Sequence, residues 1–396
     1  MVGLGSSLAA SPNVLAQPLP GVDPALPSGA RQEIRLSNLP DKRVLFQHTD
    51  RPPNLETPIT ALDGAITPND RFFVRYHLPV LPTLDEMAIW SMEIGGDAAT
   101  RPRVVKMSDL NALPQEEIVA VCQCSGLRRG LFQPYVAGVQ WGHGAVGCAT
   151  WRGPRLRDVL ALAGVKPEAV EIWFEGADGP NLTGSPDYRK SLPVAKAMAD
   201  ETILATAMNG APLPLLNGNP VRVVVPGWTA TYWLKHVMRI EISTKALDAF
   251  WMRPAYRVPA NMFPVDQPFV SQQQGDTWAI TEMVVNSLIA SPQNGEQVGR
   301  AGFTVRGVAW DRGYGIRRVE VSLDDGKTWF DGLLGRDYGN YAFRTFSFST
   351  GNLPIGPRSV SVRATNNKRE RQVDTLKVNP SGYHNNLPHR IQVLVA

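Results

Sequence analysis

The most informative stretch of this sequence is residues 118–130, which read IVAVCQCSGLRRG. Its apolar, β-branched first half predicts a buried strand that delivers two thiols into a turn, directly before two arginines. Alternation along the strand would point Cys122 and Cys124 to the same face. Nearby guanidinium charge lowers the pKa of a thiol, and the thiolate is the form that binds a metal or attacks a substrate. The simpler alternative is that both cysteines are small buried apolar side chains.

The number and spacing of the cysteines exclude several kinds of site. Three cysteines are too few, and an odd number, for a disulfide scaffold. No second cysteine pair exists to complete a four-ligand zinc site. The sequence has no C-x-x-C-H motif, so no haem is expected to be bound by this chain's own motifs. The histidines outside residue 77 show no metal-like spacing and are expected to be mostly structural or surface residues: His48, His143, His236, His384 and His389.

Length and composition indicate a protein with a substantial core. Of the 396 residues, 43% are hydrophobic, which excludes an intrinsically disordered chain. The length suggests two domains, because single cores rarely grow beyond roughly 250–300 residues. The 35 glycines and 33 prolines exceed the usual shares of about 7% and 5%, which favours turns and short strands over long helices. No apolar run approaches ~18 residues, so no membrane span is expected.

The charge balance bears on the class of partner. The formal net charge is +4, from 40 Lys and Arg against 36 Asp and Glu, and it is spread along the chain. Nucleic-acid binding would need a concentrated basic stripe, so no nucleic acid is expected as a partner. A locally positive pocket for a small anion remains open.

The first 22 residues are expected to be a flexible tail or the remnant of an export signal. Residues 14–16, Val-Leu-Ala, resemble a signal-peptidase site, but no Lys or Arg precedes Arg31, so the cationic start of a secretory signal is missing. We favour the remnant.

The region from 23 to 252 is expected to be a domain of mixed α+β class. Strand-like patterns lie at 71–77, 90–94, 170–174 and 221–225, and helix-like patterns lie at 156–163 and 193–208. Because these strands and short helices do not alternate regularly as βαβ units, the pattern favours an α+β fold.

A change in composition and residue pattern separates a second domain from the first. Residues 253–278 are rich in Pro and Gln and are expected to be a linker. Beyond it, residues 279–396 show period-two alternation at 303–310, 318–322 and 359–364, separated by turn signals. This pattern predicts an antiparallel β-sandwich of about immunoglobulin size.

Two groups of cations outside the cysteine stretch could bind an anion. Arg75 and His77 lie two residues apart on an expected strand, so both side chains would share one face. An arginine grips an oxyanion with paired donors, and a histidine adds a titratable one. Arg222 follows a glycine-containing turn, and Lys235 and Arg239 come soon after, which suits phosphate or pterin-like oxyanions. Taken singly, each is more often a solvated charge.

Together these stretches resemble the sulfite oxidase family of molybdopterin enzymes, over roughly residues 60–396. Residues 73–77, FVRYH, are similar to the family's F-V-R-N-H segment, and residues 124–129, CSGLRR, to its C-A-G-N-R-R. Residues 174–178, FEGAD, and 208–227, which contain MNGAPLP and PVRVVVPG, resemble cofactor-contacting segments. Residues 308–310, 318–322 and 325–329 are similar to the family's dimerisation domain. In character the chain is most like the molybdenum subunit of a bacterial sulfite dehydrogenase.

The resemblance implies a role for each motif residue. Cys124 would be the thiolate ligand of molybdenum, with Cys122 and Cys148 as bystanders, and the pterin dithiolene and oxo groups would complete the metal's coordination. Arg75 would grip the oxyanion, and Tyr256 would be the active-site tyrosine that helps couple proton and electron transfer. The residues implied to hold the cofactor are Phe73, Val74, Arg75, Tyr76, His77, Asp178, Asn217, Arg222, Trp233, Leu234 and Lys235.

The sequence departs from the family pattern at a few of these positions. Asn217 stands where eukaryotic members carry a cofactor-contacting histidine, and Tyr76 replaces an asparagine. Leu127 sits where asparagine is usual, and Leu387-Pro388 replaces a usual Ala-Trp.

The function implied by the resemblance is oxidation of sulfite to sulfate at a mononuclear molybdenum-molybdopterin centre. Electrons would leave one at a time to a c-type cytochrome, as a separate protein or a tightly bound haem subunit. We expect a periplasmic, exported protein, with a homodimer through the C-terminal domain as one possible assembly. The alternatives are a sulfane dehydrogenase subunit of a sulfur-oxidation system and, from another class, a cofactor-free binding protein with an immunoglobulin-like module.

Overall fold

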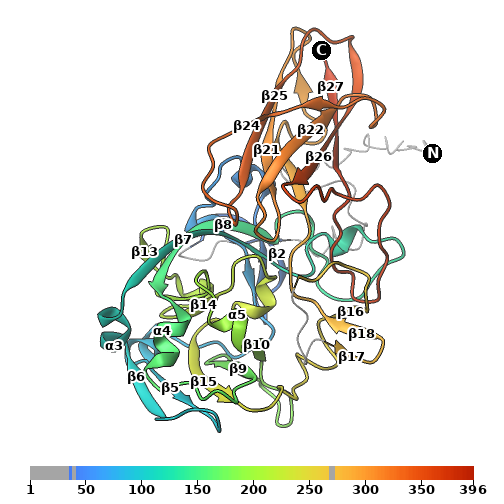
Figure 1. The fold of residues 1–396 in the computed structure, drawn as a ribbon. Helices are drawn as coiled ribbons and strands as arrows, with labels where there is room; N and C mark the ends of the chain where they lie inside the picture. Colours follow the sequence, from blue (N-terminus) through green and yellow to red (C-terminus); the bar gives the residue numbers. More distant parts are fainter. Residues whose placement is uncertain (1–34, 38–41, 267–272) are drawn as a thin grey trace, which may run out of the picture.

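Most of the regular secondary structure is β-strand. The computed structural model describes residues 35–37, 42–266 and 273–396. Figure 1 shows a larger body of strands and short helices, with an elongated C-terminal pair of sheets standing on it. The expected N-terminal tail, residues 1–22, lies outside the described residues. Within the described ranges no helix is long and apolar enough to cross a membrane.

Helices in the larger body are short. The α-helices are α2 (Leu84–Ala88), α3 (Met107–Ala112), α4 (Leu156–Ala161) and α5 (Val194–Ala197). The 3-10 helices are η1 (Ile59–Leu62), η2 (Asn69–Arg71), η3 (Arg129–Leu131), η4 (Leu215–Asn217) and η5 (Ala230–Tyr232). The expected α+β mixture is therefore weighted strongly towards β.

The central sheet of the larger body has the order β10-β9-β15-β5-β6. Its strands are β10 (Arg189–Pro193), β9 (Glu171–Gly176), β15 (Val237–Ser243), β5 (Ser91–Gly95) and β6 (Arg103–Lys106). Only β15 and β5 run parallel; the other pairs are antiparallel. The strands expected at 90–94 and 170–174 are confirmed as β5 and β9.

The cysteine stretch lies on a long hairpin. Strand β7 (Gln115–Gln123) pairs along its whole length with β8 (Val146–Pro154), and β12 (Ala207–Met208) and β13 (Ala211–Pro212) extend the sheet beyond β8. Cys122 lies opposite Gly147, where a Cβ would come within 2.6 Å of the Phe72 ring. A side chain at position 147 would therefore push Phe72 away from the wall of the site described below.

The helix expected over 193–208 is wrong beyond its first turn. Helix α5 ends at Ala197, and β11 (Ile203–Ala205) pairs instead with β14 (Arg222–Val224). Residues 207–208 pair with β8. Pairing with strands distant in the sequence thus overrides the local helical pattern. The periodicity of one segment cannot reveal such pairing.

Two smaller sheets border the central body. The sheet β1-β2-β3-β4 contains β1 (Arg35–Ser37), β2 (Leu45–Thr49), β3 (Asn54–Glu56) and β4 (Val74–Arg75), so the strand expected at 71–77 is only two residues long. The predicted linker, 253–278, contains part of the sheet β16-β18-β17: β16 (Arg257–Pro259), β17 (Gln273–Gln274) and β18 (Thr277–Ala279).

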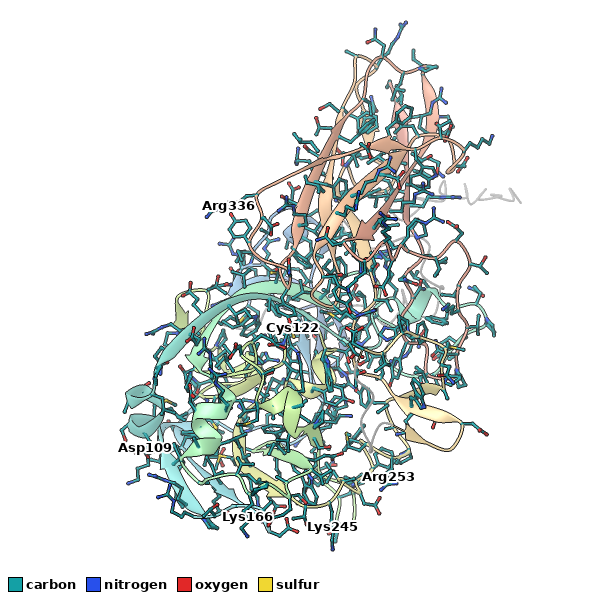
Figure 2. All side chains as sticks on the ribbon, viewed as in Figure 1. Asp109, Cys122, Lys166, Lys245, Arg253 and Arg336 are labelled. Atoms are coloured by element: carbon teal, nitrogen blue, oxygen red, sulfur yellow. The ribbon has the colours of Figure 1, made fainter. Side chains whose placement is uncertain are left out.

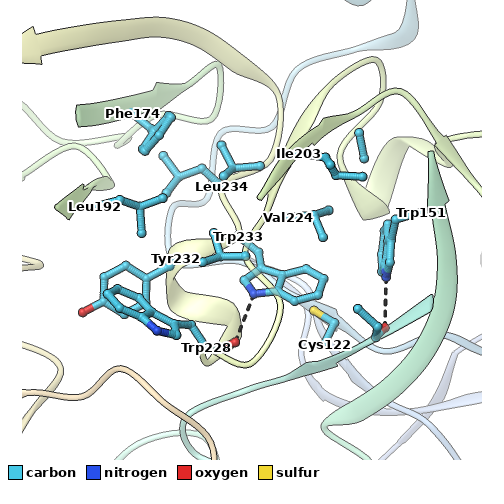
Figure 3. Packing of buried hydrophobic residues seen from close by; sticks show 14 of the residues in the cluster. Cys122, Trp151, Phe174, Leu192, Ile203, Val224, Trp228, Tyr232, Trp233 and Leu234 are labelled. Atoms are coloured by element: carbon cyan, nitrogen blue, oxygen red, sulfur yellow. Dashed lines mark hydrogen bonds between the residues drawn. The ribbon is translucent and has the colours of Figure 1, made fainter. Parts of the chain in front are cut away.

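Large aromatic side chains fill the interior beside the hairpin. Figure 3 shows Cys122 among Trp151, Val224 and Trp233, all buried. The indole of Trp151 donates to the Ala120 carbonyl at 3.0 Å. Because these indoles are both packed and hydrogen-bonded, the walls around Cys122 are held in fixed positions.

The C-terminal region consists of two sheets around a separate apolar core. One has the order β19-β21-β25-β24 and the other β20-β27-β26-β22-β23, antiparallel except where β20 meets β27. The first contains β19 (Asn286–Ser291), β21 (Thr304–Trp310), β25 (Arg344–Ser349) and β24 (Leu333–Leu334). The second contains β20 (Gln297–Val298), β27 (His389–Val395), β26 (Gly356–Asn366), β22 (Ile316–Ser322) and β23 (Phe330–Asp331). The expected strands 303–310, 318–322 and 359–364 are confirmed.

The two regions are joined next to the cysteine stretch. Arg128, fully buried, donates to the Leu387 carbonyl and to the Ser287 carbonyl, each at 2.7 Å. The indole of Trp310 on β21 donates to Oε1 of Gln123 at 2.7 Å. The C-terminal region therefore supports the turn that carries Cys124.

Candidate active site

A cavity lies at the end of β7 beside β4, and its empty space of about 630 Å³ includes solvent at its open mouth. The neighbouring Cys122 is buried, and in the view of Figure 2 it lies below the C-terminal region. Every residue predicted for the site except Val74 lines this cavity: Phe73, Arg75, Tyr76, His77, Cys124, Asp178, Asn217, Arg222, Trp233, Leu234, Lys235 and Tyr256. The structure thus brings together segments that are up to about 180 positions apart in the chain.

Two of the three thiols face the cavity, as strand alternation predicts. Cys124 follows the last residue of β7, and its amide donates to the Ala145 carbonyl at 2.9 Å. Cys122 also lines the cavity, and its Sγ lies 3.9 Å from Nη2 of Arg222. Burial raises the pKa of the Cys122 thiol to about 11, although Arg222 acts in the opposite direction. Cys148 lies elsewhere, and burial raises its pKa to about 12.

The two arginines after the thiols are not the cations that line the cavity. Arg128 points to the C-terminal region, as described above. Arg129 donates to the Ser381 carbonyl at 3.1 Å, and its guanidinium carbon lies 5.2 Å from the ring centroid of Tyr383. The guanidinium groups in the cavity wall are instead those of Arg75 and Arg222. The expectation that adjacent arginines serve the thiols directly is wrong, because the turn after Cys124 directs them elsewhere.

Arg75 and His77 face the same cavity, as predicted. The guanidinium of Arg75 donates to Oδ1 of Asn54 at 3.0 Å and to the Tyr76 carbonyl, which fixes its orientation. Nε2 of His77 is hydrogen-bonded to the hydroxyl of Tyr256. Burial lowers the pKa of His77 well below its ordinary value, and the Arg75 charge adds to this effect. His77 is thus held neutral, and a neutral imidazole can exchange a proton with a phenol.

Tyr256 stands in an unusual backbone conformation at the cavity wall. Its φ is 61°, in the left-handed region that costs free energy for residues other than glycine. Burial raises the pKa of its phenol, while the charge of Arg75 and a hydrogen bond from Arg75 oppose that rise. The strain and the burial both point to a position fixed by its surroundings.

The FVRYH segment divides its side chains between the cavity and a small core. Phe73 and Tyr76 line the cavity, and the hydroxyl of Tyr76 bonds Nε2 of His236 at 2.6 Å. Val74 packs instead with Leu45 and Leu55, away from the cavity. Its side chain therefore does not line the cavity, and the predicted contact with the cofactor stays a prediction that only its backbone could fulfil.

A carboxylate and an amine that interact electrostatically, those of Asp178 and Lys235, both line the cavity. Burial raises the pKa of Asp178, and the charge of Lys235 opposes that rise. Burial lowers the pKa of Lys235 well below its ordinary value, and the charge of Asp178 opposes that fall. Lys235 also donates to the Leu216 carbonyl at 3.3 Å and lies over the Tyr76 ring.

Asn217 and Arg222 form a second polar wall. Nη1 of Arg222 donates to the Asn217 carbonyl at 2.8 Å, and its guanidinium carbon lies 5.0 Å from the Trp151 ring centroid. The side-chain oxygen of Asn217 accepts from the buried Lys42 at 2.5 Å. The position at which the sequence departs from the family's histidine is therefore occupied by an asparagine tied to a lysine.

Besides Cys122, further residues line the cavity that sequence reasoning missed: Phe72, Ser125, Tyr188, Leu216, Ala230 and Thr231. The ring of Tyr188 stacks on His77, with centroids 4.0 Å apart. Its hydroxyl bonds Oγ1 of Thr231 at 2.7 Å. Nothing in the sequence near residue 188 signals this contact, because it depends on β10 lying beside the FVRYH segment.

The cavity fits a polar, negatively charged group that brings its own ligands. Oγ of Ser125 and Nε of Arg222 are buried without a hydrogen-bond partner among the described residues. The lining contains three basic side chains, those of Arg75, Arg222 and Lys235, and one carboxyl group, that of Asp178. This balance favours an anion. No group of three or more His, Cys, Asp or Glu in the described part of the chain is arranged to hold a metal. The two thiols of the cavity, Cys122 and Cys124, are too few to complete the coordination of a metal, so a metal here would need further ligands supplied by a cofactor.

Comparison with known proteins agrees with this donor set. The family profile "oxidoreductase molybdopterin binding domain" matches residues 77–251, and "Mo-co oxidoreductase dimerisation domain" matches residues 277–396. The chain is 36% identical over 370 residues to the mitochondrial sulfite oxidase of Macaca fascicularis, covering 89% of this chain and 66% of that protein. It is 34% identical over 322 residues to the sulfite oxidase of Gallus gallus, covering 78% and 67%. The chain belongs to the sulfite oxidase family of molybdopterin enzymes.

As a member of that family, the chain binds molybdenum-molybdopterin, and the polar lining of the cavity is compatible with such a cofactor. The chain spans about two thirds of the length of the sulfite oxidases that it matches. A similar solved structure is that of the sulfane dehydrogenase SoxCD from Paracoccus pantotrophus, with a TM-score of 0.74 and 26% identity. That match covers 97% of this chain and 92% of the other. Leu127, at a position where the family usually carries asparagine, is buried in the core.

Proposed function

We propose that this chain oxidises sulfite to sulfate at a molybdenum-molybdopterin centre and passes the electrons one at a time to a c-type cytochrome. The observation that carries the proposal is the meeting, in one cavity, of the Cys124 thiol, the Arg75 guanidinium and the hydrogen-bonded pair of His77 and Tyr256. When bound, molybdenum-molybdopterin supplies oxygen-atom transfer to sulfur and accepts two electrons.

The residues of the chain supply position and charge. Cys124 would hold the metal through its thiolate, as the resemblance of residues 124–129 to the family's C-A-G-N-R-R implies, and the structure places its side chain in the cavity wall. Arg75 would bind the sulfite dianion: its side chain reaches the cavity from β4 and is oriented by Asn54. The pterin would be held by the backbone of the FVRYH segment and by further cavity residues, namely Asp178, Asn217, Arg222, Trp233, Leu234 and Lys235. Oriented cations of this kind act mainly by electrostatic stabilisation.

Tyr256 and His77 would handle the proton. Oxidation of sulfite consumes a water and releases two protons with the two electrons, so a proton acceptor near the reacting atoms is useful. The hydrogen bond between the Tyr256 hydroxyl and Nε2 of His77 would let a proton pass between the cavity and the imidazole. Because the pKa of His77 is lowered well below its ordinary value, the ring would relay the proton and not hold it.

A specific observation favours a second candidate, sulfane dehydrogenase activity. The similarity to SoxCD covers nearly the whole of both chains, whereas the sulfite oxidases extend well beyond this chain. Steady-state assays separate the two: the purified holoenzyme is offered free sulfite in one arm and a carrier protein loaded with thiosulfate in the other. Turnover of sulfite supports the proposal, and turnover of the loaded carrier alone supports the second candidate. The cofactor-free binding protein is set aside, because the chain belongs to a molybdopterin family.

Assembly and location follow as part of the same proposal. The match of residues 277–396 to a dimerisation domain supports a homodimer through the C-terminal region, testable by light scattering of the purified protein. A periplasmic location would bring the chain together with c-type cytochromes. Fractionation of cells that express the full gene tests it.

A further inference from the structure

A lysine that the proposed chemistry does not use lies directly behind the cavity. Lys190 on β10 is completely buried, although lysine is among the residues least often found inside proteins. It does not line the cavity. On β10 its neighbour Arg189 points the other way and pairs with Glu175 on β9, so the alternation of the strand directs Lys190 inwards.

The ammonium of Lys190 contacts the segment that carries Tyr256 in two ways. Nζ lies 5.1 Å from the ring centroid of Tyr256 and 4.5 Å from that of Tyr232, both within the range of a cation–π contact. Nζ also donates to the Trp251 carbonyl at 2.7 Å. Lys190 therefore holds both the ring of Tyr256 and the backbone five residues before it.

Tyr256 needs such support because its backbone is strained. Its φ of 61° persists only where the surroundings fix it. On another side, Tyr383 stacks on Tyr256 with centroids 5.7 Å apart, and Arg129 lies over Tyr383. The phenol that meets His77 is thus at the centre of an aromatic cluster with a cation at each end.

A merely space-filling role does not require an amine. An apolar side chain of the same length would fill the volume between the two rings without the cost of burying an ammonium. Burial, together with the nearby charge of Arg257, lowers the pKa of Lys190 well below its ordinary value. The hydrogen bond to the Trp251 carbonyl and the two ring faces oppose this effect, because both favour the charged form.

We propose that Lys190 is a positioning residue, which holds Tyr256 in the orientation that meets His77. It acts through Tyr256 and does not touch the substrate. The consequence for turnover rests on the proposed function; the contact with Tyr256 does not.

The test compares three variants of the full chain. Lys190→Met removes the charge and keeps the length, and Lys190→Arg keeps the charge. Lys196→Met is the matched control, because Lys196 bonds Glu201 and lies 5.9 Å from the Trp228 ring centroid, outside the cavity. The first readout needs neither cofactor nor substrate: the signals of the nine tyrosines are followed by NMR after labelling of Cζ with ¹³C, and Tyr256→Phe assigns that of Tyr256.

The proposal predicts that Lys190→Met moves the Tyr256 signal, while Lys190→Arg and Lys196→Met leave it in place. In the molybdenum-loaded enzyme, Lys190→Met should lower kcat for sulfite roughly tenfold with KM unchanged, and Lys190→Arg should restore it. An unmoved Tyr256 signal in Lys190→Met, or an equal loss of kcat in Lys196→Met, would overturn the proposal. If wild-type enzyme does not turn over sulfite, the proposed function fails but the NMR arm still decides the role of Lys190.

A second variant covers failure of Lys190→Met to fold. In the wild-type protein the two rings should shift the ε-methylene protons of Lys190 upfield, and Tyr256→Leu should reduce that shift by about half, since one of the two rings is lost. An unchanged ε-methylene signal in Tyr256→Leu would contradict the contact.

Discussion

The hydroxyl of Tyr256 and Nε2 of His77 are hydrogen-bonded to each other across 179 positions of the chain. Burial disfavours the charged form of each group, so it raises the pKa of the phenol and lowers that of the imidazole. Paired, they place a neutral proton donor and acceptor beside Arg75 and the cavity. This relationship gives the proposed chemistry its proton path.

The assignment of the metal ligand predicts different effects for two neighbouring cysteines. Cys124→Ser should abolish sulfite turnover, whereas Cys122→Ser, in which the partner of Arg222 becomes a hydroxyl, should be largely tolerated. Turnover is measured at matched protein concentration, and metal content is measured by mass spectrometry to show whether the variants still take up molybdenum. Equal loss of turnover in both variants would refute the assignment of Cys124.

Removal of the Arg75 guanidinium should mainly weaken binding of the anion. Arg75→Gln is expected to raise KM for sulfite by an amount equivalent to roughly 2–4 kcal/mol, as for loss of a buried charged hydrogen bond. The matched control is Arg239→Gln, because Arg239 is about half exposed on β15 and pairs with Glu241. A fall in kcat with unchanged KM would show that Arg75 does not bind the substrate anion.

His236 should make the folded state sensitive to acid. Its Nδ1 donates to the Asn219 carbonyl at 2.6 Å, and in the neutral ring Nε2 accepts from the hydroxyl of Tyr76. Burial lowers its pKa to about 3. The unfolded chain, with an ordinary pKa near 6.5, binds a proton that the folded chain does not, so the free energy of unfolding should fall as pH drops from about 6.5 towards 3.

The loss from His236 is expected to reach a few kcal/mol at most, at about 1.4 kcal/mol per pH unit. Urea unfolding at several pH values between 7 and 4 measures it. His236→Asn should reduce the slope of stability against pH, and asparagine tolerates the positive φ of 53° at this position. Burial also lowers the pKa of His384 to about 3. His384 therefore adds the same slope of stability against pH in the wild-type protein and in His236→Asn. An unchanged slope in His236→Asn would contradict the account.

Arg128 should contribute to stability more than to catalysis. Arg128→Met leaves the Ser287 and Leu387 carbonyls without its two charged hydrogen bonds, which should lower the free energy of unfolding by about 2–4 kcal/mol. Arg306→Met is the control: it removes an exposed ion pair with Asp63 that also links the two regions, and should cost less than about 1 kcal/mol. Denaturant unfolding compares them. Equal losses would show that burial of Arg128 gives it no special role.

Local patterns in the sequence predicted those parts of the molecule that depend on local geometry. Alternation placed Cys122 and Cys124 on one face, and the family resemblance identified a set of residues of which only Val74 lies away from the cavity. The contacts of Arg128 and Lys190 could not be predicted, because each depends on segments brought together by the fold. The same holds for the segment 203–208, where pairing with distant strands replaces an expected helix. The linker at 253–278 and the immunoglobulin-like character of the C-terminal sandwich stay predictions.

The measurement that tests the central claim most directly is reduction of cytochrome c by the purified, molybdenum-loaded protein on addition of sulfite. The account predicts an absorbance increase at the reduced haem band that saturates with sulfite, yields two reduced haems per sulfate formed and is absent in Cys124→Ser. A molybdenum-loaded wild-type protein that forms no sulfate and reduces no cytochrome c would contradict it.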